Sequence, residues 1–152
     1  QQLRIHSINL EGNYNGQALA RIFQHCPNLT HLSISQCPMS AETLEALQTA
    51  MVVQSGDPIQ KEKPLTFLSM SSCQLTDTLL ENFVSLLEVH NENGETNSNF
   101  FSGVQKLIIS RQPLTCQSLA ALTRLTQTTD RLVLSSNLNL FTDANLAQLE
   151  SW

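Results

Sequence analysis

Residues 65–73 read LTFLSMSSC, with apolar side chains at the first, fourth and sixth positions and a cysteine at the ninth. The same nine-residue frame, in which the ninth residue is Asn, Cys or Gln, fits the chain five times. The frames begin at Ile5, Leu29, Leu65, Val104 and Thr129, and only the last has a polar first position. A spacing that recurs this often indicates an internal repeat.

A segment with the apolar spacing of a helix comes after each of the first four frames. Apolar residues lie three or four positions apart, as one buried helix face requires. The expected core-facing residues include Leu19, Ile22 and Phe23 after the first frame, Leu44, Leu47 and Met51 after the second, Leu80, Phe83 and Leu87 after the third, and Leu119, Leu122 and Leu125 after the fourth. Residues such as Thr76, Asp77 and Thr115 precede these segments, and their side-chain oxygens are expected to cap free helix amides.

Composition narrows the function classes. The chain has 152 residues, 41% of them hydrophobic, and a net charge of −5, which suits one domain with a real core. Only eight residues are Lys or Arg, and the longest basic stretch, Lys61-Glu62-Lys63, is interrupted by an acid. We therefore expect no nucleic-acid partner, because phosphate contacts need clustered cations. No apolar run approaches the ~20 residues that span a bilayer, so no membrane partner is expected either.

Motifs for catalysis and cofactor binding are missing from the sequence. It contains no nucleophile elbow, no phosphate-binding glycine loop and no zinc-protease helix motif, so we expect no enzyme activity, cofactor or small-molecule substrate. The four cysteines include no Cys-x-x-Cys pair, which favours reduced, structural thiols in a cytosol-like compartment. His25, Cys26, His31 and Cys37 are zinc-ligand types, but strand alternation directs His31 outward and Cys37 inward, so no metal site is expected.

The repeated frame resembles the leucine-rich-repeat family, whose units carry Leu-x-x-Leu-x-Leu-x-x-(Asn/Cys)-x-Leu. The segments 26–32 and 73–77 resemble its cysteine-containing subclass, and the helical second halves resemble its ribonuclease-inhibitor-like subclass. This resemblance implies an α/β solenoid, with parallel strands on the concave face and helices on the convex face. It also implies a scaffold for protein partners.

The resemblance covers almost the whole chain, so residues 1–152 are expected to form a single domain of about five repeats. The two middle units are longer than the family's usual period by roughly a dozen residues each. We expect inserted loops near residues 53–64 and 90–103. The start at Gln1 and the end at Trp152 favour a piece of a longer protein.

Residues between the core positions of each strand are expected on the concave face, because side chains alternate along a strand. They form three columns across the predicted sheet. The first column is Ser7, His31, Phe67, Lys106 and Arg131; the second is Asn9, Ser33, Ser69, Ile108 and Val133; the third is Glu11, Ser35, Ser71, Ser110 and Ser135.

Three apolar residues, Phe67, Ile108 and Val133, interrupt the polar columns, and exposed apolar clusters often mark contact sites. An apolar centre with a cationic rim is typical of protein interfaces. The predicted partner-binding residues are His31, Phe67, Lys106, Ile108, Arg111, Arg131 and Val133. Strand propensity alone also favours Ile and Val, and other segments could cover them, so both interpretations stay open.

The sequence therefore predicts a protein–protein interaction module that presents a rigid concave sheet. The alternative is a structural or autoinhibitory repeat domain that packs against a domain outside these residues. The repeats resemble those of ubiquitin-ligase adaptors and also those of effectors that bacteria deliver into host cells. Both settings imply the cytoplasm, which is the host cytoplasm for an effector.

Overall fold

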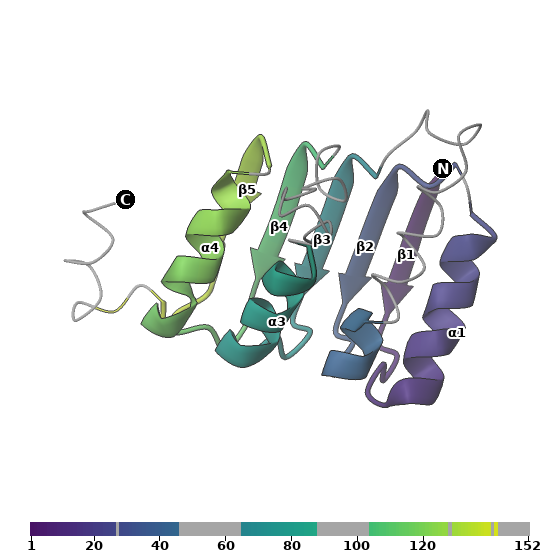
Figure 1. The fold of residues 1–152 in the computed structure, drawn as a ribbon, viewed down its shortest axis with the longest axis horizontal. Coiled ribbons are helices and arrows are strands. Elements are labelled where there is room, and N and C mark those ends of the chain that lie inside the picture. Colours follow the sequence, from purple (N-terminus) through teal and green to yellow (C-terminus); the bar gives the residue numbers. More distant parts are fainter. Residues whose placement is uncertain (27, 46–64, 88–103, 128, 141, 143–152) are drawn as a thin grey trace, which may run out of the picture.

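The computed structural model describes residues 1–26, 28–45, 65–87, 104–127, 129–140 and 142, in which strands and helices alternate (Figure 1). In chain order the elements are β1 (Gln2–His6), α1 (Asn13–Gln24), β2 (His31–Ser35), a helical segment at 41–45, β3 (Phe67–Ser71), α3 (Asp77–Leu87), β4 (Lys106–Ser110), the 3-10 helix η1 (Cys116–Ser118), α4 (Leu119–Thr126) and β5 (Arg131–Val133).

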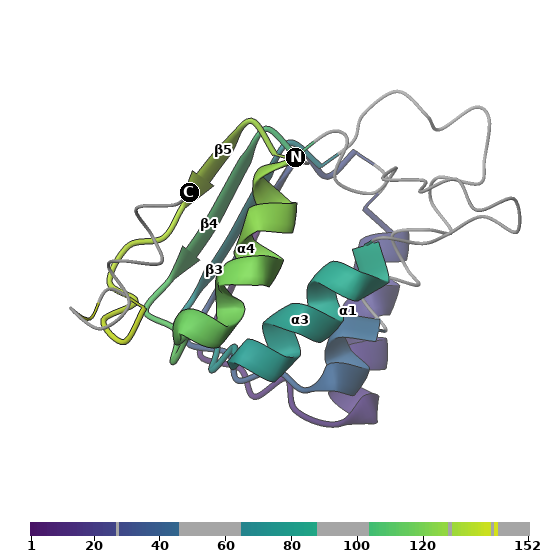
Figure 2. The same cartoon turned by 60° about the vertical axis from the view of Figure 1, so that its left-hand side comes forward.

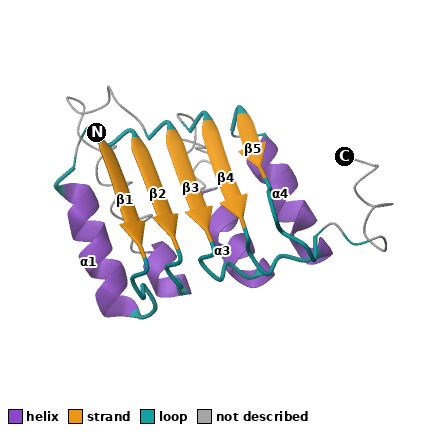
Figure 3. Ribbon diagram, turned by 180° about the vertical axis from the view of Figure 1, so that it is seen from behind, coloured by secondary structure: helices purple, strands orange, loops and turns teal. Residues whose placement is uncertain are grey.

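The five strands form one parallel sheet, in which the order of the strands is the order of the chain. The helices lie together on one face of this sheet (Figure 2). Seen from behind, the strands lie in front of the helices, and no described helix covers them (Figure 3). This helix-free side, called the open face below, corresponds to the predicted concave face. The arrangement confirms the predicted α/β solenoid.

The core lies between the sheet and the helices and follows the alternation of the frames. Inward residues of the three central strands are almost fully buried: Leu32 and Ile34, Leu68 and Met70, and Leu107 and Ile109. Leu80, Phe83, Leu122 and Leu125 meet them from α3 and α4, as the helical spacing predicts. Each buried Leu or Ile stabilises the fold by about 1.5–3 kcal/mol. Stacked units share this core, which one unit could not enclose alone.

The ninth residue of each of the last four frames turns into the core and joins two neighbouring units. Cys37, Cys73, Gln112 and Asn137 are all buried, as predicted. The backbone N–H of Cys73 donates to Oε1 of Gln112 at 3.1 Å, and the N–H of Gln112 donates to Oδ1 of Asn137 at 2.8 Å. A buried amide without a partner is costly, so these side chains satisfy backbone groups beyond the strand ends.

The first frame, predicted to begin at Ile5, is wrong in register. β1 pairs with β2 so that Ile5 faces Ile34, and Ile8 takes the place of Cys37. Ile8 is 52% exposed instead of lying in the core. β1 is an edge strand, and no described segment covers its outer side. The residues that β1 presents to the open face are Gln2, Arg4 and His6, in place of the predicted Ser7, Asn9 and Glu11.

A left-handed residue in the turn after each strand supports the corrected register. These residues have φ angles between 53° and 59° and are Ser7, Gln36, Ser72, Arg111 and Ser136. Their N–H groups bond to the next unit: that of Ser7 donates to the carbonyl of Ser35, and that of Ser72 to the carbonyl of Ser110, both at 3.0 Å. Ser7 is therefore a turn residue equivalent to Gln36, not a strand residue.

The buried face of α1 also differs in part from the prediction. Leu19 is buried, as expected, but Ile22 is 45% exposed, and the side chain of Phe23 lies outside the described structure. The two helical segments approach each other closely at Gly16, where a Cβ atom would lie 2.8 Å from the Cα of Thr43. A glycine is needed there because any side chain would push the two segments apart.

Predicted capping residues have two different roles. Oγ1 of Thr76 accepts from the N–H of Leu79 at 3.3 Å and so caps α3. The carboxylate of Asp77 instead reaches the next unit, where it accepts from the N–H and hydroxyl of Thr115, at 2.8 and 2.6 Å, and from the hydroxyl of Ser118. Burial alone raises the pKa of Asp77, but the hydrogen bonds from Ser118 and Thr115 outweigh it and hold that pKa below its usual value.

The predicted inserted loops, at 53–64 and 90–103, lie outside the described residues, as do Leu47 and Met51. The side chain of Leu87 lies outside them too.

Candidate protein-binding surface

The strand register aligns the outward residues of neighbouring strands in rows across the open face. In one row, Phe67 on β3 faces His31 on β2 and Lys106 on β4, and Lys106 faces Arg131 on β5. In the next row, Ile108 lies between Ser69 and Val133. The register thus confirms the first two predicted columns from β2 to β5.

Phe67 is held between its two neighbours. The ring of His31 stacks on it, with centroids 5.5 Å apart and planes inclined by 21°. The ammonium group of Lys106 lies over the Phe67 ring, 5.7 Å from its centroid. The ring of His31 has a polar neighbour of its own, because the hydroxyl of Thr30 lies 2.9 Å from its Nδ1 atom. Aromatic stacking and cation–π contacts each contribute about 0.5–1.5 kcal/mol, so the residues form an ordered row before any partner binds.

Ile108 and Val133 extend the apolar surface onto β4 and β5. Both side chains are half-buried, and so is Phe67. Side chains on the adjacent strands cover part of each of them, because adjacent strands are only about 4.8 Å apart. The apolar centre is therefore a partly covered patch in the sheet rather than three protruding side chains.

The third column is less open than predicted. Ser35 and Ser71 are half-buried, and Ser110 is only 9% exposed. The carbonyls of Ser35, Ser71 and Ser110 accept N–H groups from the turns of the preceding units, which brings those turns close to the strand ends. The column therefore adds little contact surface from β2 to β4, whereas Ser135, after β5, is exposed.

Arg111 is exposed, but it lies in the turn after β4 and not on a strand. It therefore lies where β4 ends, at the edge of the open face. The other six predicted binding residues lie on the strands, and the structure brings them together on one face: His31, Phe67, Lys106, Ile108, Arg131 and Val133.

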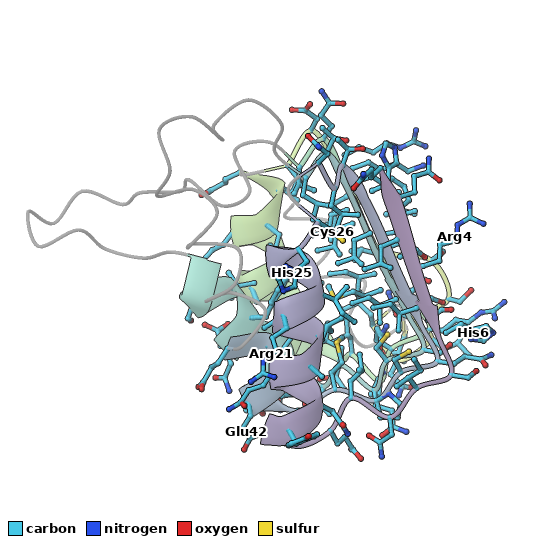
Figure 4. The ribbon with its side chains drawn as sticks, turned by 90° about the vertical axis from the view of Figure 1, so that its right-hand side faces the viewer. Arg4, His6, Arg21, His25, Cys26 and Glu42 are labelled. Atoms are coloured by element: carbon cyan, nitrogen blue, oxygen red, sulfur yellow. The ribbon has the colours of Figure 1, made fainter. Side chains whose placement is uncertain are left out.

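The sequence reasoning missed Arg4 and His6. Both side chains project from β1 on the side of the sheet away from α1 (Figure 4). Nδ1 of His6 lies 3.3 Å from the carbonyl oxygen of Ser35, so His6 also contacts β2. The alternation of Leu3 and Ile5 could have revealed them, but the frame laid over Ile5 and Ile8 used the same apolar residues in another register.

Comparison with known families identifies one repeat directly. The Leucine Rich Repeat family matches residues 64–86, a segment that contains β3, the turn after it and most of α3. The same unit recurs along the five-stranded parallel sheet. The fold is an α/β solenoid consistent with leucine-rich repeats. No curated protein matches the chain. Leucine-rich repeats generally mediate protein–protein interaction.

The four cysteines lie outside the strands that form the open face. Cys37 and Cys73 are fully buried, Cys26 and Cys116 are half-buried, and all four are free. Burial raises the pKa of the Cys73 thiol, which weakens its reactivity. Among the described residues, no three His, Cys, Asp or Glu side chains gather closely enough to hold a metal ion. In the same residues, no helix has the length and apolar character needed to cross a membrane.

Proposed function

We propose that this leucine-rich-repeat solenoid is a protein-interaction module that binds a protein partner through its open face. The observation that supports this most is the row of His31, Phe67 and Lys106, in which a half-buried aromatic ring is fixed on both sides. Side chains that are already ordered lose little entropy on docking, so their contacts contribute more to affinity.

Each part of the patch has a role in this proposal. Phe67, Ile108 and Val133 supply the apolar surface that a partner removes from water. Arg131 and Arg111, both exposed, supply charged hydrogen-bond donors at its margin. Large aromatic and Arg side chains are the residue types that most often dominate binding energy in protein interfaces.

The test is a paired pull-down from cell lysate with the whole chain as bait. One bait is the wild type, and the other carries Phe67→Ser, Ile108→Asp and Val133→Asp. A third bait carries Tyr14→Ser and Ile22→Asp, which remove exposed apolar residues from α1 on the opposite side. Thermal melts of all three baits establish that they are folded.

We expect proteins that the wild type and the α1 variant retain and the open-face variant loses. Retention of the same proteins by a folded open-face variant would contradict the proposal and would direct attention to the segments at 53–64 and 90–103.

The alternative is that the open face packs against another domain of a longer protein, as a structural or autoinhibitory contact. The partial exposure of Phe67 and Ile108 fits this proposal as well. Hydroxyl-radical footprinting of longer chains distinguishes the two, because only an intramolecular contact shields Phe67 without an added partner.

We also propose that the repeats are of the cysteine-containing or ribonuclease-inhibitor-like type and act in the cytoplasm without enzymatic activity. Support comes from the buried free thiols of Cys37 and Cys73 at ninth positions, which suit a reducing compartment. A ubiquitin-ligase adaptor and a bacterial effector in the host cytoplasm are the two settings that such repeats suggest.

A further inference from the structure

Charge is distributed unevenly between the two faces of the solenoid. The chain carries a net charge of −5, yet none of the acidic residues in the described part of the chain falls within a strand. The open face instead carries Arg4, Lys106 and Arg131, with Arg111 in the turn after β4. The helical side holds described acids such as Glu42, Asp77 and Glu81. A net acidic chain therefore presents a cationic sheet.

Two of these cations face each other directly. Lys106 and Arg131 are register partners on adjacent strands, and their side chains leave the sheet on the same face. Like charges in this position destabilise a sheet. The ammonium of Lys106 lies over Phe67, on the strand away from Arg131. Within the described structure, neither cation forms an ion pair, whereas Arg124 on α4 pairs with Glu81 on α3 at 2.6 Å.

We propose that the open face binds an acidic segment of a protein partner, with a carboxylate placed between Lys106 and Arg131. This inference rests on the proposed function and specifies the chemistry of the partner. An apolar side chain next to that carboxylate would cover Ile108 and Val133, which lie in the neighbouring row. The bound carboxylate removes the repulsion between the two cations, so binding is favoured over the free state.

The width of the sheet suggests that the bound segment of the partner is short. Five strands about 4.8 Å apart place β1 and β5 about 19 Å from each other. An extended chain covers this distance in about six residues, so one segment could reach from Arg131 to Arg4. Lys106 and Arg131 are adjacent, but Ser33 and Ser69 lie between Arg4 and β4, and all four cations lie on a net acidic protein. A nucleic acid, which needs a continuous cationic path, is therefore the less favourable partner.

The test begins with selection of displayed random peptides on the whole wild-type chain. Recovered peptides are labelled, and their affinities are measured by fluorescence anisotropy at low and high salt. The variants are Arg131→Glu, Ile108→Asp and Arg21→Glu. Arg21 is exposed on α1 and serves as the matched charge reversal on the helical side (Figure 4).

We expect recovered peptides rich in Asp and Glu that bind more weakly at high salt. Arg131→Glu should weaken binding by about tenfold or more, and Arg21→Glu should change it little. Because the new glutamate faces Lys106, the Arg131→Glu protein should melt at the same or a higher temperature than the wild type. Loss of binding then cannot be attributed to unfolding.

The other outcomes overturn the inference. Neutral peptides that lose affinity with Ile108→Asp but not with Arg131→Glu would leave the proposed function intact and refute the acidic partner. Peptides that are indifferent to both substitutions would contradict the inference and the proposed function together. Recovery of no peptide would refute the inference. Tighter binding of a labelled oligouridylate, lost with Arg131→Glu, would assign the cations to nucleic acid.

Discussion

At the residue scale, the ninth position of each repeat determines how neighbouring units are joined. Gln112 makes the most contacts: its Oε1 accepts from the N–H groups of Cys73 and Leu75, and its Nε2 donates to the carbonyls of Met70 and Ser110. All of these groups are buried, so the amide cannot be replaced by water. Cys37 and Cys73 occupy the same position with a weaker donor and acceptor.

Gln112→Leu should therefore destabilise the solenoid by about 2–5 kcal/mol, because it leaves two buried N–H groups without an acceptor. Urea unfolding followed by circular dichroism measures this difference. Gln117→Leu, at an exposed position of η1, is the matched control and should change stability by less than about 0.5 kcal/mol. Equal effects of the two substitutions would contradict the role of Gln112.

Cysteine reactivity gives a second prediction at this scale. Cys26 and Cys116 are half-buried, whereas Cys37 and Cys73 are fully buried and burial raises the pKa of Cys73. Only the thiolate reacts with iodoacetamide, so the native chain should be modified first at Cys26 and Cys116. Mass spectrometry of timed samples measures the order. Modification of Cys73 as fast as that of Cys116 would contradict the burial described above.

At the element scale, hydrogen bonds between units attach the start of α3 to the start of the following helical segment. Asp77 begins α3, yet it bonds to Thr115 and Ser118 around η1. On the same side, Arg124 pairs with Glu81 and connects α4 to α3. These side-chain bonds supplement the apolar packing of Leu80 and Leu122 and fix the spacing of the helices.

Asp77 also predicts a pH dependence. Its pKa is held below the value of an unfolded Asp, about 3.9, so its stabilisation is present above that pH and is lost as the pH falls through the folded pKa. Asp77→Asn should reduce stability at neutral pH by about 1.5 kcal/mol, a low value because the carboxylate is partly exposed. Urea titrations should show this difference shrinking as the pH falls below about 3.9. A difference that stays constant, or one equally large for the exposed Asp130→Asn, would contradict this role.

At the scale of the whole molecule, four of the five units could be predicted from the sequence. In the frames at Leu29, Leu65, Val104 and Thr129 the alternating residues lie in the core or pack against it, as Leu65, Leu132 and Leu134 do, and the ninth residues are buried, because one physical requirement sets both patterns. The first unit failed because Ile5, Ile8 and Leu10 satisfy two registers. In the observed register, the position equivalent to Leu29 would come before Gln1. The first position of the frame therefore could not be used to choose between the two registers.

The candidate site was predictable to a similar extent. Phe67, Lys106 and Ile108 lie on one face because alternation fixes their direction. The predicted columns also placed His31 beside Phe67 and Lys106 beside Arg131, but the stack of His31 on Phe67 and the position of the Lys106 ammonium depend on side-chain conformation, which spacing does not fix. Arg4 was missed with the first register. The cations Lys106, Arg111 and Arg131 were therefore part of the prediction, and the assembled sheet adds Arg4 to them.

The most direct test of the central claim, that the open face binds the partner, is site-specific photo-cross-linking. A benzoylphenylalanine replaces Ile108 on β4 in one protein and the exposed Tyr14 on α1 in another, and each is irradiated in lysate. The open-face account predicts a cross-linked protein adduct from position 108, suppressed by excess unlabelled wild type, and none from position 14. An adduct from position 14 alone, or no adduct from position 108, would contradict it.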